Sequence, residues 1–290
     1  MFSGAFTAIV TPFKNGRVDE KGLKNLIRFG MDGGVSGFIP CGTTGESPTL
    51  SHDEHNRVVE LTVKEVAGQV KVIAGTGSNC TDEAISLTKH AKEFGADAAL
   101  LVSPYYNKPT QEGLYKHFAA VAAAVDIPLV LYNIQGRTGV NIENSTVKRL
   151  SEIPNIVGVK EASGSILQMS EVIRLCSPEF DVLSGDDQMT FPLMALGGKG
   201  VISVVTNIIP DKMSALVKHM LAGQIDKARA IHFEIFELCQ TMFVETNPIP
   251  IKAALGLMGK IEPEFRLPLC APSAVSLEKI RTALVKLNLI

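Results

Sequence analysis

The chain of 290 residues has no tryptophan, four tyrosines and only five cysteines. The cysteines are odd in number and widely scattered, and no two of them form a C-x-x-C pair. This usage argues against a disulfide framework and against a zinc site, and it is typical of a protein in a reducing cytoplasm.

An excess of charge of one sign is also missing, because 28 Lys and Arg residues stand against 30 Asp and Glu residues. No cluster of basic residues is present, so neither nucleic acid nor a membrane surface is expected as a partner. The N-terminus lacks a basic segment followed by an apolar one, and we expect no signal peptide. No uninterrupted apolar run approaches the length needed to span a membrane.

The sequence does contain a regular alternation of two patterns. Short apolar runs recur about every thirty residues, which is the length of one βαβ unit. Most are rich in Val, Ile, Leu and Ala on both faces, as is typical of strands covered on both sides in a parallel sheet. The expected strands are 5–10, 36–40, 71–75, 97–102, 128–132, 156–160, 181–184 and 200–204.

Helical patterns occupy the segments between these strands. Leu23, Leu26, Ile27 and Met31 fall on one helical face, and Ser51 stands at capping-box spacing before Glu54. The other helices are expected at 81–94, 111–125, 144–152, 166–176, 188–196 and 211–222. This alternation predicts a (β/α)8 TIM barrel. A doubly wound sheet is the alternative, but no glycine-rich fingerprint follows the first strand.

The alternation ends near Gly223, and the remaining segment has a different character. It reads as helical at 225–244, 249–259 and 276–287, with prolines between the helices. We therefore expect a catalytic barrel at 1–223 and a C-terminal helical region at 224–290.

The most informative residue is Lys160, at the end of the sixth expected strand. In such barrels the working face lies at the carboxyl ends of the strands. Burial there favours the neutral amine, which is a nucleophile toward ketones and aldehydes. Lys71 stands at a strand start instead. The alternative is that Lys160 is only a snorkelling or ion-paired side chain.

Other reactive side chains also follow the expected strands. Tyr105, Tyr106 and Tyr132 could relay protons, although a buried tyrosine often only packs. The turn at 42–47 offers consecutive N–H groups to an anion, or it needs its glycines only for backbone conformation. Arg137 is a second candidate for holding a carboxylate, unless it is an ordinary surface arginine.

No metal or phosphate motif accompanies these residues. His52 and His55 stand three apart, but the order is not that of a zinc protease and no third ligand is near in sequence. We therefore predict no metal.

Taken together, the motifs are more specific than any one of them. The chain resembles the pyruvate-dependent class I aldolase (N-acetylneuraminate lyase) superfamily and, within it, the dihydrodipicolinate synthase family, from Phe2 to the C-terminal helices. The resemblance is carried by Gly42-Thr43-Thr44-Gly45-Glu46, Tyr105-Tyr106-Asn107-Lys108-Pro109, Tyr132-Asn133, Arg137-Thr138-Gly139, Gly158-Val159-Lys160-Glu161-Ala162 and 247–252.

The resemblance implies an activity. Lys160 would form a Schiff base with pyruvate, and the resulting enamine would condense with L-aspartate 4-semialdehyde in the first committed step of lysine (diaminopimelate) biosynthesis. No other cofactor is implied. The family is usually a homotetramer of two tight dimers, in which Tyr106 reaches a neighbouring subunit.

The resemblance also implies roles for individual residues. Tyr132, Thr43 and Tyr106 would relay protons. The N–H groups of Thr43 and Thr44 would hold the pyruvate carboxylate. The other substrate-binding positions would be Arg137, for the semialdehyde carboxylate, and Gly185 and Ile202, which would line the pocket.

Lysine-inhibited members of the family bind L-lysine at the tight-dimer interface. The matching positions here are Ser47, His52, His55, Asn79, Glu83 and Tyr105. Two departures stand out: Pro48 replaces a smaller residue near this set, and Ile134-Gln135-Gly136 replaces a proline-containing run before Arg137.

Two rival functions remain open at this point. A sister aldolase, such as N-acetylneuraminate lyase or a keto-deoxy-sugar acid aldolase, would keep Lys160 and Tyr132 but would need a sugar-shaped pocket. A catalytically silent barrel would serve binding or regulation and would form no Schiff base.

Overall fold

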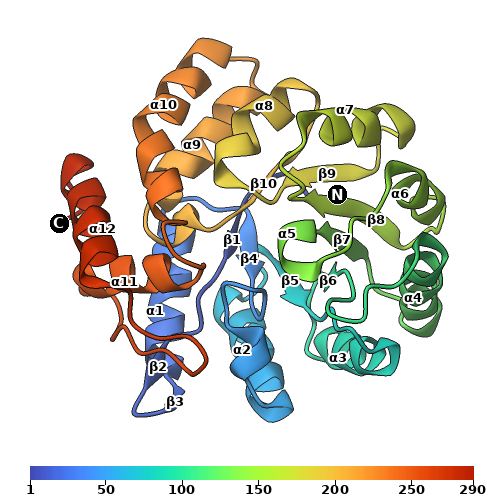
Figure 1. The fold of residues 1–290 in the computed structure, drawn as a ribbon, viewed down its shortest axis with the longest axis horizontal. Helices are drawn as coiled ribbons and strands as arrows, with labels where there is room; N and C mark the ends of the chain where they lie inside the picture. Colours follow the sequence, from blue (N-terminus) through green and yellow to red (C-terminus); the bar gives the residue numbers. More distant parts are fainter.

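Eight parallel strands pair in sequence and close on themselves in the computed structural model, which describes residues 1–290 (Figure 1). The barrel closes where β1 pairs with β10, so the predicted (β/α)8 barrel is confirmed and the open sheet is wrong. The barrel strands are β1 (Gly4–Ala8), β4 (Gly37–Ile39), β5 (Lys71–Gly75), β6 (Ala98–Val102), β7 (Leu129–Asn133), β8 (Ile156–Glu161), β9 (Asp181–Ser184) and β10 (Gly200–Ser203).

Helices follow the strands and form the outer ring seen in Figure 1. They are α1 (Glu20–Asp32), α2 (His52–Val66), α3 (Thr81–Glu93), α4 (Gln111–Ala124), α6 (Asn144–Leu150), α7 (Ile166–Leu175), α8 (Thr190–Ala195) and α9 (Pro210–Leu221). The capping box expected at the start of α2 is present. The Ser51 hydroxyl accepts from the Glu54 N–H at 3.2 Å, and the Glu54 carboxylate accepts from the Ser51 N–H at 3.0 Å.

Several elements differ from the sequence-based expectation. The first strand ends at Ala8 rather than at residue 10, and a small hairpin of β2 (Phe13–Lys14) and β3 (Arg17–Val18) follows it. The one-turn helix α5 (Gln135–Thr138) stands between β7 and α6. Elements this short contain too few residues to show a hydrophobic period.

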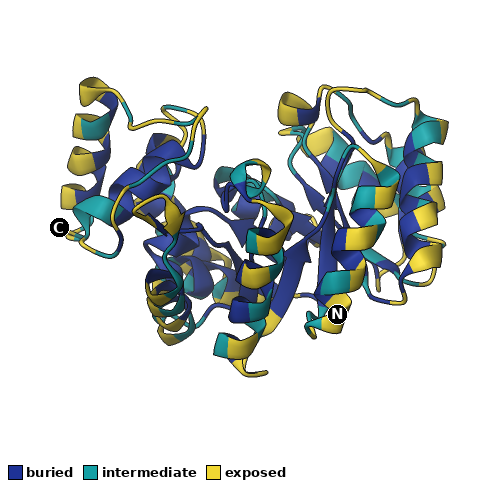
Figure 2. Cartoon of the chain, turned by 90° about the horizontal axis from the view of Figure 1, so that it is seen from below, coloured by how far each residue is buried: buried dark blue, intermediate teal, exposed yellow.

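The barrel interior is filled by side chains rather than by solvent. Phe6, Ile73, Leu100, Val130 and Leu183 belong to one buried cluster that also contains Tyr132 and Ile202. The faces of the helices that turn toward the strands are buried, and the faces that turn away from the barrel are exposed (Figure 2). The packed interior leaves the strand ends as the place for a reactive site.

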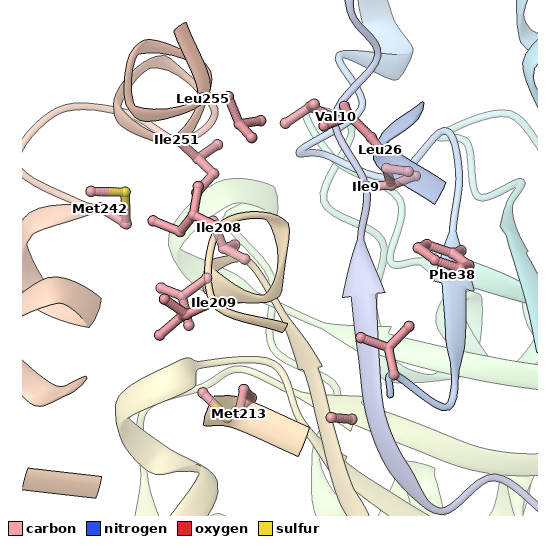
Figure 3. Close-up of a cluster of buried hydrophobic side chains, with 14 of the residues drawn as sticks. Ile9, Val10, Leu26, Phe38, Ile208, Ile209, Met213, Met242, Ile251 and Leu255 are labelled. Atoms are coloured by element: carbon pink, nitrogen blue, oxygen red, sulfur yellow. The ribbon is translucent and has the colours of Figure 1, made fainter. Parts of the chain in front are cut away.

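The C-terminal helices are α10 (Ile225–Thr241), α11 (Ile249–Leu257) and α12 (Ala274–Lys286). They share one apolar cluster with the barrel. Ile251 and Leu255 of α11 lie near Ile208 and Val10 of the barrel (Figure 3). The domain boundary at 223 and 224 stays a prediction. None of the helices combines the length and apolar character that a membrane crossing requires.

Candidate active site

Lys160 lies in the interior of the barrel, at the carboxyl-terminal part of β8. Its side chain is 6 % exposed, and its Cα pairs with Tyr132 of β7 and Leu183 of β9. The Nζ atom lies 4.1 Å from the centre of the Tyr132 ring. The other buried lysine, Lys252, forms an ion pair with Glu46, whereas no ion pair includes Lys160. The ion-paired alternative therefore describes Lys252 and not Lys160.

The absence of a side chain at Gly185 leaves space for the Lys160 side chain. A Cβ atom at this position would lie 2.7 Å from Ala162 Cβ and 3.1 Å from Lys160 Cε. The first distance is too short for two carbon atoms and the second is tight, so a larger residue would press on both Ala162 and the Lys160 side chain. Ile202 on β10 is 1 % exposed within the interior cluster. Both residues lie at strand ends, where they were expected.

The turn that follows β4 carries the two threonines. It is closed by hydrogen bonds from Gly45 N to Gly42 O and from Glu46 N to Thr43 O, each of 3.1 Å. Thr44 is 2 % exposed, and its hydroxyl accepts from Asn247 Nδ2 at 2.9 Å. A residue of the C-terminal region thus fixes one of the expected substrate-binding side chains.

Arg137 lies on α5 and is held by the same C-terminal residue. Its Nη2 atom donates to the backbone carbonyl of Asn247 at 2.8 Å. Arg137, Tyr132 and Thr43 line one cavity of about 400 Å³. Lys160 does not line this cavity, although the Tyr132 ring that it contacts does. The cavity therefore brings three of the expected residues together beside the lysine.

The same cavity extends to the candidate regulatory residues. Ser47, His52, His55, Glu83 and Tyr105 line it, whereas Asn79 does not. Asn79 instead donates from Nδ2 to the Tyr105 carbonyl at 3.2 Å. Candidate catalytic residues and candidate regulatory residues thus line one continuous cavity.

The surroundings of Glu83 and His55, two of the candidate regulatory residues, shift their pKa values. His52 Nε2 donates to Glu83 Oε1 at 2.9 Å, and the Ser78 hydroxyl donates to the other oxygen. The Ser78 hydrogen bond, aided by His52, lowers the pKa of the Glu83 carboxyl. Burial lowers the pKa of His55, whose Nε2 lies 2.8 Å from the Gly75 carbonyl. An anion beside a neutral imidazole is suited to a ligand with an ammonium group.

Tyr106 is the expected residue that the single chain does not bring to the site. Its side chain is 91 % exposed, and it does not line the cavity. Its φ of 70° lies in the left-handed region, where a bulky residue is uncommon. The loop therefore presents this ring outward.

No group of three or more His, Cys, Asp or Glu side chains is arranged to hold a metal ion. The two histidines instead use a ring nitrogen each for Glu83 and for the Gly75 carbonyl.

Comparison with known proteins identifies the family to which a chain with this site belongs. Residues 1–287 match the model of the dihydrodipicolinate synthetase family. The chain belongs to the dihydrodipicolinate synthetase family. It is 58 % identical to the 4-hydroxy-tetrahydrodipicolinate synthase of Syntrophus aciditrophicus over 290 residues, with 100 % of both chains covered. The relative from Geotalea daltonii is 55 % identical, also over 100 % of both chains.

Solved structures of the dihydrodipicolinate synthetase family have the same fold. The dihydrodipicolinate synthase of Aquifex aeolicus aligns with a TM-score of 0.98 and 51 % identity, covering 99 % of each chain. The enzyme of Cyanidioschyzon merolae, solved with lysine bound, aligns with a TM-score of 0.96 and 42 % identity, covering 100 % of this chain and 99 % of that one. The expectation of a lyase with 4-hydroxy-tetrahydrodipicolinate synthase activity is confirmed, and the sister-aldolase alternative is not favoured.

Sequence reasoning gave no role to the residues that hold the site from the C-terminal side. Asn247 contacts both Thr44 and Arg137, and Lys252 pairs with Glu46 in the turn after β4. These partners are more than 100 residues apart in sequence. The sequence offered one indication of their importance. The segment Asn247-Pro248-Ile249-Pro250-Ile251-Lys252 resembles the family, but this resemblance alone gives no physical reason for a role of Asn247 or Lys252.

Proposed function

We propose that the Lys160 amine forms a Schiff base with pyruvate and that the resulting enamine condenses with L-aspartate 4-semialdehyde. The observation that carries this proposal is the buried, unpaired Lys160, which stands over the Tyr132 ring with space made by Gly185. A desolvated lysine without a counter-ion is a nucleophile for a ketone.

The reaction balances without an outside oxidant or reductant. The amine adds to the pyruvate ketone, and water leaves to give an iminium ion. The iminium accepts the electron pair of a methyl C–H bond as the proton departs, which gives the enamine. The enamine carbon attacks the aldehyde, whose oxygen takes up a proton. The substrate amine then adds to the iminium carbon, closes the ring and releases Lys160.

The proton transfers need hydroxyl groups near the reacting carbon. Tyr132 contacts Lys160, and Thr43 lines the cavity beside it, which supports their role as relays. Tyr106 completes the relay from a neighbouring subunit. Its ring is 91 % exposed on its own chain and is therefore free to enter the site of another subunit. This requires an oligomer, for which we propose a homotetramer of two tight dimers.

The two carboxylates bind at opposite sides of the reacting centre. The N–H groups of Thr43 and Thr44 hold that of pyruvate, and Arg137 holds that of the semialdehyde. Gly185 and Ile202 line the pocket. No cofactor beyond the covalent intermediate enters the reaction. The enzyme acts in the first committed step of lysine biosynthesis in the cytoplasm, and its five free cysteines support a reducing compartment.

L-Lysine binds in the part of the cavity that is lined by Glu83 and the two histidines. The lining by five of the six expected residues supports this site, and a relative was solved with lysine bound. Pro48 also lines the cavity, and its ring restricts the backbone conformations of the loop beside it.

Borohydride trapping tests the central step. The protein is incubated with pyruvate, reduced, digested and analysed by mass spectrometry. The expected result is a reduced pyruvate adduct on Lys160 and on no other lysine, and its absence contradicts the proposal. A parallel assay compares condensation with aspartate semialdehyde against cleavage of a sugar acid, and activity only in the second would favour a sister aldolase.

A further inference from the structure

A buried carboxylate lies directly behind the reactive lysine. Successive side chains of a strand point to opposite faces, so Lys160 and Tyr132 face the interior while Glu161 and Asn133 face the helices. The register pairs Tyr132 with Lys160 and Asn133 with Glu161. Glu161 and Asn133 are both 0 % exposed.

Every group that contacts the Glu161 carboxylate is a hydrogen-bond donor. Oε1 accepts from Ser163 N at 2.6 Å. Asn133 Nδ2 donates to Oε2 at 3.1 Å and to Oε1 at 3.5 Å, and Gln168 Nε2 donates to Oε2 at 3.3 Å. No lysine, arginine or histidine forms an ion pair with Glu161, so neutral donors alone satisfy the charge. The site therefore suits a group that accepts hydrogen bonds on both of its oxygens, as a carboxylate does.

The donors are themselves fixed in orientation. Asn133 Oδ1 accepts from Ile142 N at 2.9 Å, and Asn133 Nδ2 also donates to Asn141 Oδ1 at 2.8 Å. Asn141 and Gln168 exchange two hydrogen bonds of 3.1 Å. This network joins the ends of β7 and β8 to the segment after Arg137 and to the first turn of α7.

We propose that Glu161 is a positioning residue for the Schiff-base chemistry. Its hydrogen-bonded carboxylate fixes the ends of β7 and β8 relative to each other, and thereby the Lys160 amine relative to the Tyr132 hydroxyl. The inference deepens the proposed function and rests on it, because it concerns the same lysine.

The all-donor surroundings make the conservative substitution informative. In Glu161→Gln, the new amide NH2 must face Ser163 N, Asn133 Nδ2 or Gln168 Nε2, each of which is a donor. Asn133 cannot turn its amide without losing Ile142 N. The strand ends must therefore shift, and a small misplacement of reacting groups costs a large part of the rate.

The experiment compares Glu161→Gln with Glu171→Gln, which makes the same change on α7 at an exposed carboxylate that pairs with Arg174. For Glu161→Gln we expect kcat to fall by about tenfold or more, while KM for pyruvate stays within about threefold, because the carboxylate-binding groups are untouched. For Glu171→Gln we expect wild-type kinetics. A wild-type kcat in Glu161→Gln overturns the inference, as does a loss that only follows the unfolded fraction.

A reciprocal exchange separates positioning from general damage. In the double variant Asn133→Asp/Glu161→Gln, the new amide on β8 donates to the new carboxylate on β7. That carboxylate still accepts from Ile142 N, and Asn141 and Gln168 can turn together at the loss of only the 3.3 Å bond from Gln168 Nε2 to the Ile142 carbonyl. We expect this double variant to recover kcat by about fivefold or more over Glu161→Gln. No recovery in a folded double variant overturns the inference.

If Glu161→Gln does not fold, Gln168→Met replaces it, since Gln168 is half-buried and supplies only one of the donors to the Glu161 carboxylate. We then expect kcat to fall by about threefold without a change in KM, and an unchanged kcat overturns the inference. Failure of the wild-type protein to trap pyruvate would instead overturn the proposed function, so the two failures are distinguishable.

Discussion

At the scale of single residues, position along a strand was enough to find Lys160 and Tyr132. Both lie at the carboxyl ends of barrel strands, and a parallel register places them side by side. The alternation of side chains then decides that Lys160 faces inward and Glu161 outward. The sequence did not show that Glu161 is surrounded by donors, because Asn133, Ser163 and Gln168 come from three separate segments.

Gly185 offers a prediction at this scale. In Gly185→Ala, the added methyl group would meet Ala162 Cβ at 2.7 Å and Lys160 Cε at 3.1 Å, so Ala162 and the lysine side chain must shift. We expect kcat to fall by about tenfold or more. Gly136→Ala adds the same group where nothing lies within 4 Å, and its kcat should stay within about twofold. Equal kinetics for the two variants would contradict this account.

Asp187 gives a prediction about pH. Burial raises the pKa of its carboxyl from 3.8 to about 6, although Val204 N and Val205 N donate to it. The folded protein therefore holds this proton more tightly than the unfolded chain. The resulting stability is fully present below about pH 4 and is lost as the pH rises through 6, a change of about 3 kcal/mol. Denaturant unfolding between pH 4 and 7 should show this decline in the wild type and not in Asp187→Asn.

At the scale of elements, hydrophobic periodicity located the long pieces and missed the short ones. The strands at 71–75 and 181–184 have the predicted bounds, because each is a short, mostly apolar run that ends at a glycine or directly before one. The predicted strand 5–10 ends at Ala8, and the hairpin and α5 were not foreseen. α5 matters for function because it carries Arg137, and it is held by Asn247 from a distant part of the chain.

The ion pair between the turn after β4 and α11 is a testable feature of this scale. Lys252 and Glu46 are both fully buried, and the Lys252 Nζ lies 4.3 Å from the centre of the Phe13 ring. Lys252→Met leaves the Glu46 charge without a partner and should destabilise the protein by about 3–5 kcal/mol. It should also raise KM for pyruvate, because the turn carries Thr43 and Thr44.

Two further variants check the cause of that loss. Glu46→Gln/Lys252→Met removes both charges and should recover most of the stability in denaturant unfolding. Lys286→Met breaks an exposed pair with Glu237 and should change the free energy of unfolding by about 0.5 kcal/mol or less. A double variant as unstable as Lys252→Met would show that the charge is not the reason.

At the scale of the whole molecule, a single chain provides every part of the proposed site except Tyr106. Lys160, Tyr132, Thr43 and Arg137 lie around one cavity or against its wall, whereas the Tyr106 ring is 91 % exposed. The sequence could rank this tyrosine as a candidate from its place after a strand. It could not show that the ring points outward on its own chain, because that depends on how the loop folds, which includes a left-handed backbone at Tyr106.

This arrangement makes a sharp prediction for mixed oligomers. Lys160→Ala lacks the nucleophile and Tyr106→Phe lacks the relay hydroxyl, so each homodimer should be nearly inactive. In a mixed dimer, the site of the Tyr106→Phe subunit keeps its own Lys160 and receives Tyr106 from the other subunit. Random assembly of equal amounts makes half of the dimers mixed, each with one intact site of two, so activity should return to about a quarter of wild type. Co-expression with two affinity tags and native mass spectrometry gives the mixed fraction, and inactive mixed dimers would place the relay tyrosine within one chain.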